Sequence, residues 1–117
     1  MRDHRNLRAF QLADELVIDI YRATKSLPRD EMFGLTSQLR RAAVSIASNI
    51  VEGCARQSQA DFVRFLDIAF ASAREVEYQL TIAERLGFLP AEEANALGER
   101  VTETSKVTYG LLKSLRK

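Results

Sequence analysis

Arginine and glutamate side chains interrupt two long apolar stretches of this sequence, and they are its main candidates for chemistry. The first stretch, QLRRAAVSIASNIVEG at residues 38–53, carries two arginines and Glu52, and the second carries Glu75 and Glu77. Three glutamates could hold a hard divalent metal ion. Carboxylates close to arginines more often form ion pairs with them, so we expect pairing here and no metal site.

The other groups that enzymes use are scarce. His4 is the only histidine and Cys54 the only cysteine, whereas a di-iron site in a helical bundle needs a Glu-x-x-His motif on each of two helices. Nucleophilic systems that pair serine or cysteine with histidine meet the same shortage. The five glycines form no phosphate-binding loop. We therefore expect no enzymatic activity, no catalytic residue and no cofactor.

Helical periodicity runs through the elements that must position these side chains. Apolar residues recur at alternating steps of three and four in four segments, from Phe10 to Leu27, from Leu39 to Gly53, from Phe62 to Ala83 and from Leu97 to Leu115. No segment has the alternation of a strand. The sequence therefore predicts an all-α protein.

Helix boundaries are marked by residues that start or stop helices. Pro28 ends the first segment, Gly87 ends the third and Pro90 opens the fourth. Ser58, followed by Asp61, resembles a capping box at the start of the third segment. Four helices with short connections predict an antiparallel up-down-up-down four-helix bundle, and the heptad spacing predicts left-handed packing.

Length and composition set the broad class. The chain has 117 residues, a mass of 13.2 kDa and a formal net charge of +1. The length predicts a single domain over residues 1–117. The low net charge predicts no strong electrostatic field around the molecule as a whole. An unpaired cysteine fits a reducing compartment, and no apolar run approaches the ~18 residues of a membrane span. We expect a cytoplasmic protein with no membrane partner.

The segment 38–53 is apolar over an unusually wide arc when it is drawn as a helix. Leu39, Ile46 and Ile50 lie with several alanines and valines in an arc of roughly 200°, although a surface helix needs a stripe only somewhat wider than ~100°. We expect copies of the chain to cover the surplus by forming a homo-oligomer.

Arg40 falls inside this apolar arc, where an unpaired guanidinium would be costly. If the second and third helices form a hairpin, Arg40 and Arg41 lie level with Glu75. We expect an ion pair from one of these arginines to Glu75, assisted by Ser72. The alternative is that the charged groups extend to water independently.

Small polar residues on the same helix have two interpretations. Ser45, Ser48, Asn49 and Glu52 could form a ligand groove, or they could allow close helix packing while Glu52 supports Arg56. We favour the structural interpretation. The predicted polar cluster comprises Arg40, Arg41, Ser45, Asn49, Glu52, Ser72 and Glu75.

Basic residues gather at one end of the predicted bundle. The start of the first helix, the connection between the second and third, and the end of the fourth contribute Arg2, Arg5, Arg8, Arg56, Arg64, Lys113, Arg116 and Lys117. Such an end could bind RNA or DNA phosphates without reading sequence. The alternative is that bases near a helix carboxyl end complement its dipole.

A partner protein is the other candidate ligand. The apolar surface of the second helix, together with Phe65, Phe70 and Tyr78 on the third, could recruit another chain. In that case the protein is an adaptor or scaffold without a nucleic-acid role.

Two segments together carry a specific combination of residues, EMFGLTSQLRRAAVSIASNIVEGCARQS at 31–58 and FVRFLDIAFASAREVEYQL at 62–80. Their most specific positions are Gly34, Leu35, Gln38, Arg40, Arg41, Ala42, Ala43, Ser45, Ile46, Asn49, Ile50, Glu52, Gly53, Ser72 and Glu75. On these residues the chain resembles a bacterial four-helix-bundle family that includes proteins encoded inside intervening sequences of large-subunit ribosomal RNA genes. It is also similar to the related accessory proteins of diversity-generating retroelements, which bind a reverse transcriptase and its RNA. The resemblance implies a homo-oligomeric bundle, typically a ring-like pentamer, with no established enzymatic activity.

Overall fold

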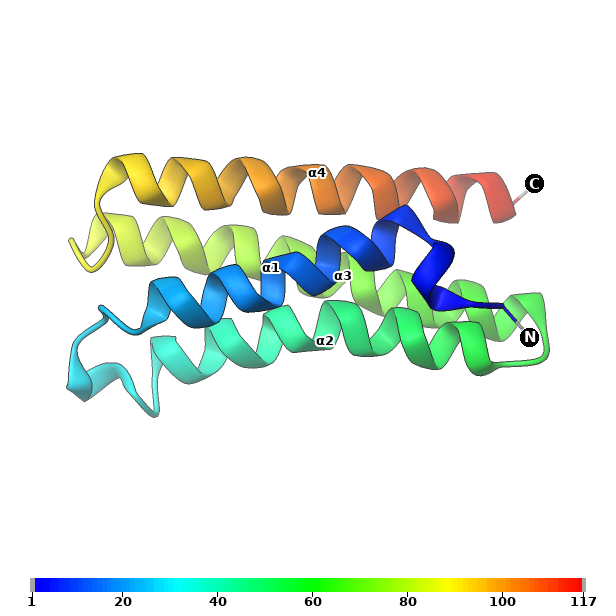
Figure 1. Ribbon diagram of the computed structural model, residues 1–117, viewed down its shortest axis with the longest axis horizontal. Helices are drawn as coiled ribbons and strands as arrows, with labels where there is room; N and C mark the ends of the chain where they lie inside the picture. Colours follow the sequence, from blue (N-terminus) through cyan, green and yellow to red (C-terminus); the bar gives the residue numbers. More distant parts are fainter. Residues whose placement is uncertain (1, 117) are drawn as a thin grey trace.

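The computed structural model describes residues 2–116 and consists of helices (Figure 1). The α-helices are α1 (Arg8–Thr24), α2 (Leu35–Ala55), α3 (Gln59–Arg85) and α4 (Ala91–Leu115). Two short 3-10 helices, η1 (His4–Asn6) and η2 (Arg29–Glu31), precede α1 and α2. No strand occurs among the described residues, so the predicted all-α class is confirmed.

The four α-helices lie side by side in an elongated bundle of 43 × 23 × 19 Å. Helices that follow each other in the chain pack together, and α4 closes the bundle by packing on α1. Short connections reverse the direction of the chain at each step (Figure 1). The predicted up-down-up-down four-helix bundle is therefore confirmed.

Local signals explain the helix ends. The Ser58 hydroxyl accepts a hydrogen bond from the Asp61 backbone N–H at 3.1 Å, which caps α3 as predicted. At the other end of α3, Gly87 adopts a φ of +77° that favours glycine, and the Phe88 N–H returns to the Ala83 carbonyl. Pro90 stands immediately before α4.

α3 contributes a row of apolar residues to the core. The residues that recur at steps of three and four in the predicted third segment are all buried, namely Phe62, Leu66, Ala69, Ala73, Val76, Leu80 and Ala83. Two of the three threonines of α4 are buried as well. The hydroxyls of Thr104 and Thr108 each donate a hydrogen bond to a backbone carbonyl one turn earlier in the helix. Neither hydroxyl is therefore an unpaired donor in the core.

The bundle itself covers most of the apolar arc on α2. Leu39, Ile46 and Ile50 are fully buried. Ala47 and Val51 are half-buried, and Val44 is the exposed member of the arc. The surplus that we expected a second copy to cover is consequently narrower than the sequence suggested.

Candidate nucleic-acid interface

The group of basic residues that the sequence analysis singled out lies at one end of the bundle, which we call the basic end. The start of α1, the α2–α3 connection and the end of α4 lie together there, and the α1–α2 and α3–α4 connections lie at the opposite end (Figure 1). Seven of the eight predicted residues belong to these described segments; Lys117 lies outside the described residues.

Four of the arginines at the basic end form an ion pair with a carboxylate. The ion pairs are Arg5 with Asp3 at 3.0 Å, Arg8 with Glu103 at 2.7 Å, Arg64 with Asp61 at 3.8 Å and Arg116 with Asp67 at 3.3 Å. The hydrogen-bonded Arg5 guanidinium lowers the pKa of Asp3, and Asp3 in turn raises the pKa of Arg5. These pairs are solvent-exposed and weak, but they reduce the positive potential around their members.

Arg2 and Arg56 are held by aromatic rings instead. The Arg2 guanidinium carbon lies 4.2 Å from the centre of the Phe62 ring, and the corresponding carbon of Arg56 lies 4.7 Å from the centre of the Phe65 ring. Arg2 also donates a hydrogen bond from Nη1 to the Arg56 carbonyl at 2.9 Å. The start of the chain is thereby joined to the α2–α3 connection.

The structure corrects the role that the sequence suggested for Phe65. We expected its ring on an apolar docking surface, but it is only 8% exposed. Besides Arg56, the Arg64 guanidinium carbon lies 4.8 Å from the centre of this ring. The three-residue spacing of Phe62 and Phe65 was a signal for a shared face, but nothing in the sequence indicated that arginines would cover it.

A shallow hollow lies beside these stacked arginines. Its lining comes from Arg2, Ala55, Arg56 and Gln57. Cys54 lies next to this segment and is buried in the core, and burial raises the pKa of its thiol. The thiol is therefore mainly protonated and inert. The polar side chains that line the hollow, Arg2, Arg56 and Gln57, are hydrogen-bond donors.

Five residues of the predicted polar cluster come together between α2 and α3, namely Arg41, Ser45, Asn49, Ser72 and Glu75. Arg41, not Arg40, approaches Glu75, with Nη2 and Oε2 3.9 Å apart. The Ser45 and Ser72 hydroxyls are hydrogen-bonded at 2.9 Å, and Asn49 donates to both the carbonyl and the hydroxyl of Ser45. These bonds connect α2 to α3 at a place where small side chains allow the helices to come close.

Arg40 has no carboxylate partner among the described residues, contrary to expectation. Its Nε donates to the Thr24 hydroxyl at 2.8 Å, and its Nη2 lies 3.4 Å from the Tyr21 carbonyl. The guanidinium also lies over the Tyr21 ring, 4.6 Å from its centre. The cause is the rotation of α2 about its own axis. The Arg40 side chain lies on the side of α2 that faces α1, whereas Glu75 lies on the side that faces α3.

The remaining glutamate predictions have different outcomes. Within residues 2–116, Glu52 forms no ion pair with Arg56, whose guanidinium is drawn to Phe65. Glu75 is directed toward α2. Glu77 forms the predicted kind of ion pair, with Arg74 at 3.8 Å, and it also accepts a hydrogen bond from Ser105 of α4 at 2.9 Å. The described chain contains no group of three acidic, histidine or cysteine side chains that could hold a metal ion.

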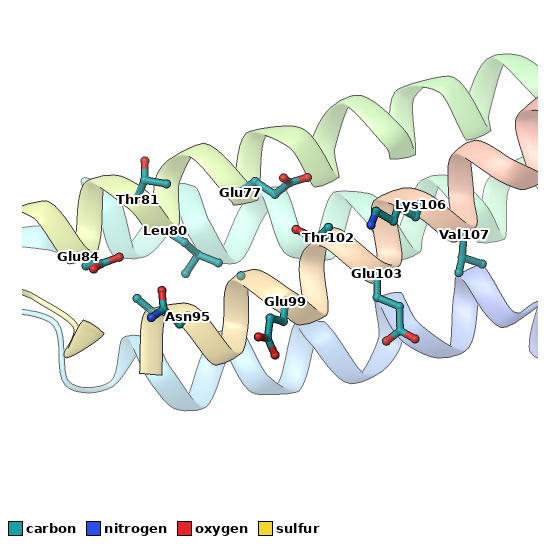
Figure 2. Close-up of a pocket in the computed structure, with 12 residues that line it drawn as sticks. Glu77, Leu80, Thr81, Glu84, Asn95, Glu99, Thr102, Glu103, Lys106 and Val107 are labelled. Carbon is teal, nitrogen blue, oxygen red and sulfur yellow. The ribbon is translucent and has the colours of Figure 1, made fainter. Parts of the chain in front are cut away.

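A groove runs between α3 and α4 (Figure 2). Glu77, Thr81 and Glu84 line it from α3, while Asn95 and Lys106 are among the residues from α4. Glu103, also at this groove, binds Arg8 of α1 on the far side of α4. Glutamates dominate the charged groups of the groove, so it does not suit a phosphate and is not the candidate site.

Exposed apolar side chains mark a second type of surface. Tyr78 is 63% exposed on α3 as predicted, whereas Phe70 is half-buried against Tyr109, with ring centres 5.4 Å apart. The side chains of Ile18 and Tyr21 on α1 and of Val44 on α2 also reach solvent. The sequence pattern of α1 did not single out the first two.

None of the helices in the described part of the chain combines the length and the apolar character needed to span a membrane. A comparison with curated proteins finds no match.

Comparisons with a family model and with solved structures agree with this fold. The model described as 23S rRNA-intervening sequence protein matches residues 5–110. A crystal structure of a protein of unknown function from the S23 ribosomal protein family of Bacteroides thetaiotaomicron is 27% identical, with a TM-score of 0.83, over 90% of this chain and 95% of that chain. Neither description names an enzymatic activity. Because the family match covers α1, α2, α3 and most of α4, together with the residues of the polar cluster, the chain belongs to the 23S rRNA-intervening sequence protein family.

Proposed function

We propose that this protein is a non-enzymatic RNA-binding or accessory protein that holds nucleic-acid phosphates at its basic end and works as an assembly of several copies. The observation that carries the proposal is the separation of charge along the long axis of the bundle. Membership of a family described by an intervening sequence of 23S rRNA supports RNA as the ligand.

Acidic residues at the opposite end complete this separation. Asp30 and Glu31 lie in η2, Glu84 lies in the last turn of α3, and Glu92 and Glu93 lie in the first turn of α4. The formal net charge of +1 therefore conceals a basic end and an acidic end. Such an arrangement steers a polyanion to one end while repelling it from the other.

Recognition at this end is directed at the phosphate backbone. The aromatic rings nearest to the arginines, Phe62 and Phe65, are buried and covered by guanidinium groups, so they offer no platform for base stacking. Binding through arginines alone depends steeply on salt and weakly on base sequence.

Fluorescence anisotropy with a labelled RNA hairpin, measured over a series of salt concentrations, tests this proposal. We expect the logarithm of the binding constant to fall linearly with the logarithm of salt concentration, and we expect hairpins of unrelated sequence to bind equally. A DNA hairpin of matched sequence separates RNA binding from general phosphate binding. Absence of binding at the lowest salt concentration would refute the nucleic-acid role.

The assembly is proposed from exposed apolar side chains and from the family resemblance, which implies a ring-like pentamer. Ile18, Tyr21 and Val44 give two neighbouring helices an apolar surface that a second copy could cover. Analytical ultracentrifugation at micromolar concentration should find a particle several times heavier than the 13.2 kDa chain. A well-folded monomer would contradict this part of the proposal.

A protein adaptor is the second candidate function, and the exposure of Tyr78 and Ile68 on α3 favours it. These side chains belong to α3, so self-association through the exposed side chains of α1 and α2 could leave them available. The anisotropy series with the RNA hairpin distinguishes the two functions, because an adaptor without a nucleic-acid role should not bind the hairpin at any salt concentration.

A further inference from the structure

Two guanidinium groups at the basic end differ from their neighbours. Within residues 2–116, neither Arg2 nor Arg56 has a carboxylate partner, although four other arginines at this end do. Lys113 has no carboxylate partner in the described chain either, but of these three unpaired basic residues only Arg2 and Arg56 lie against aromatic rings.

Both groups are also fixed in place, which is unusual for arginines at a protein surface. Arg2 lies 4.2 Å from the Phe62 ring centre and Arg56 lies 4.7 Å from the Phe65 ring centre. The two rings are themselves immobile, because they are 3% and 8% exposed and belong to α3. A flexible side chain loses rotamer freedom when it binds a ligand, and stacking of this kind reduces that loss.

The two guanidinium groups border the same hollow. Arg2 and Arg56 line it together with Ala55 and Gln57, whose amide adds a further donor. The hydrogen bond from Arg2 to the Arg56 carbonyl, 2.9 Å long, keeps the two residues next to each other. Positive charge is therefore concentrated at one place rather than spread over the end of the bundle.

The donors that remain match a phosphate group. Each guanidinium carries five N–H donors in a plane, and the only recorded acceptor of these two groups among the described residues is the Arg56 carbonyl. Planar donors of this kind bind phosphate oxygens in pairs. The nearby carboxylate of Asp3 does not compete, because Arg5 engages both of its oxygens at 3.0 Å.

We propose that Arg2 and Arg56 form a phosphate-binding subsite, that Phe62 and Phe65 are its positioning residues, and that its ligand is a phosphate of the RNA backbone. The inference rests on the proposed function and narrows it, because it assigns the binding to two of the basic residues and not to the basic end as a whole.

The first experiment measures binding of the labelled RNA hairpin to Arg2→Gln and Arg56→Gln variants of the full chain. Loss of one charged contact should weaken binding roughly tenfold. It should also reduce by about one the slope of the logarithm of the binding constant against the logarithm of salt concentration. Arg56→Lys keeps the charge but loses the planar donors, so an intermediate loss is expected. Arg29→Gln, which removes the same charge at the opposite end, is the matched control and should bind like the wild type.

The second experiment adds inorganic phosphate to the wild-type protein and follows the arginine Nε–Hε signals by NMR. Phosphate should shift the signals of Arg2 and Arg56 and leave that of Arg29 in place. This measurement separates the subsite from the RNA role, because it does not require the protein to bind RNA.

The combined outcomes distinguish the two proposals. If the wild type binds RNA and both glutamine variants bind it equally well, the subsite is refuted and the proposed function stands. If the wild type binds no RNA but phosphate shifts the two signals, the subsite stands and the RNA role is refuted. If neither RNA nor phosphate has an effect, both are refuted.

Discussion

Arg40 and Arg41 are adjacent in the sequence yet connect α2 to different neighbours. Consecutive residues of a helix point about 100° apart, so Arg40 reaches Thr24 of α1 while Arg41 reaches Glu75 of α3. The first contact is a short hydrogen bond to a buried hydroxyl, and the second is a long ion pair at the surface. We therefore expect Arg40 to contribute more to stability than Arg41.

The contact of Arg40 with Thr24 can be tested by removing the hydroxyl. Thr24→Val keeps the shape of the buried side chain but leaves the Arg40 Nε without its acceptor. We expect the free energy of unfolding to fall by about 1–2 kcal/mol in urea denaturation. Thr81→Val is the matched control, because its exposed hydroxyl bonds only to the Tyr78 carbonyl of its own helix; equal losses in the two variants would contradict the contact.

Cys54 gives a second prediction for a single residue. Burial raises the pKa of its thiol and removes it from solvent, so Ellman's reagent should modify the native protein only as fast as it unfolds, and modify the urea-denatured chain at once. A raised folded pKa stabilises the protein at pH values below the ordinary thiol pKa, and this contribution is lost as the pH rises through the folded pKa. Rapid modification of the native protein at neutral pH would show that the thiol is accessible.

At the scale of the helices, the glycines of α2 and α4 have different surroundings. A Cβ built on Gly53 of α2 would lie 3.0 Å from the Phe65 Cβ and 3.1 Å from the Phe62 Cδ1. A Cβ on Gly98 or Gly110 of α4 would meet nothing within 4 Å. Only the first glycine is required by packing, and it also supports the two rings beneath Arg2 and Arg56.

This difference predicts opposite effects of the same substitution. Gly53→Ala should lower the free energy of unfolding by about 1–3 kcal/mol, because it forces α2 and α3 apart. Gly98→Ala and Gly110→Ala should raise it by about 0.5–1 kcal/mol, because alanine is the better helix former. Thermal and urea denaturation of the three variants would measure these changes, and a stabilised Gly53→Ala protein would contradict the close approach.

The sequence predicted the helices and their order well, because periodicity, Ser58, Gly87 and Pro90 act locally. It also placed Arg41 level with its partner Glu75, because a tight α2–α3 connection leaves little freedom, although it did not predict that Ser72 would bond to Ser45. It failed where the rotation of a helix about its own axis decides the outcome, as for Arg40. The stacking of Arg2 on Phe62 was not predictable either, since those residues are sixty positions apart in the chain.

At the scale of the whole molecule, the position of a charge matters more than the total. Replacing Arg2, Arg56 and Lys113 by glutamine removes three positive charges from the basic end, and replacing Lys25, Arg29 and Arg85 removes three from the opposite end. Both triple variants have the same formal net charge, changed from +1 to −2.

The two triple variants should behave differently on a cation exchanger at pH 7. We expect the wild type to be retained by its basic end, the first variant to elute at clearly lower salt, and the second to elute close to the wild type. Similar elution of both variants would mean that net charge alone controls retention and that the basic end has no separate field.

The position of Arg2 and Arg116 at the same end of the bundle has a practical consequence. An affinity tag or a surface anchor attached to either terminus would lie over the arginines that we assign to phosphate, and a polyhistidine tag would add its own charge there. A fluorophore or an immobilising group belongs instead in the α1–α2 or α3–α4 connection (Figure 1), where it leaves the basic end open.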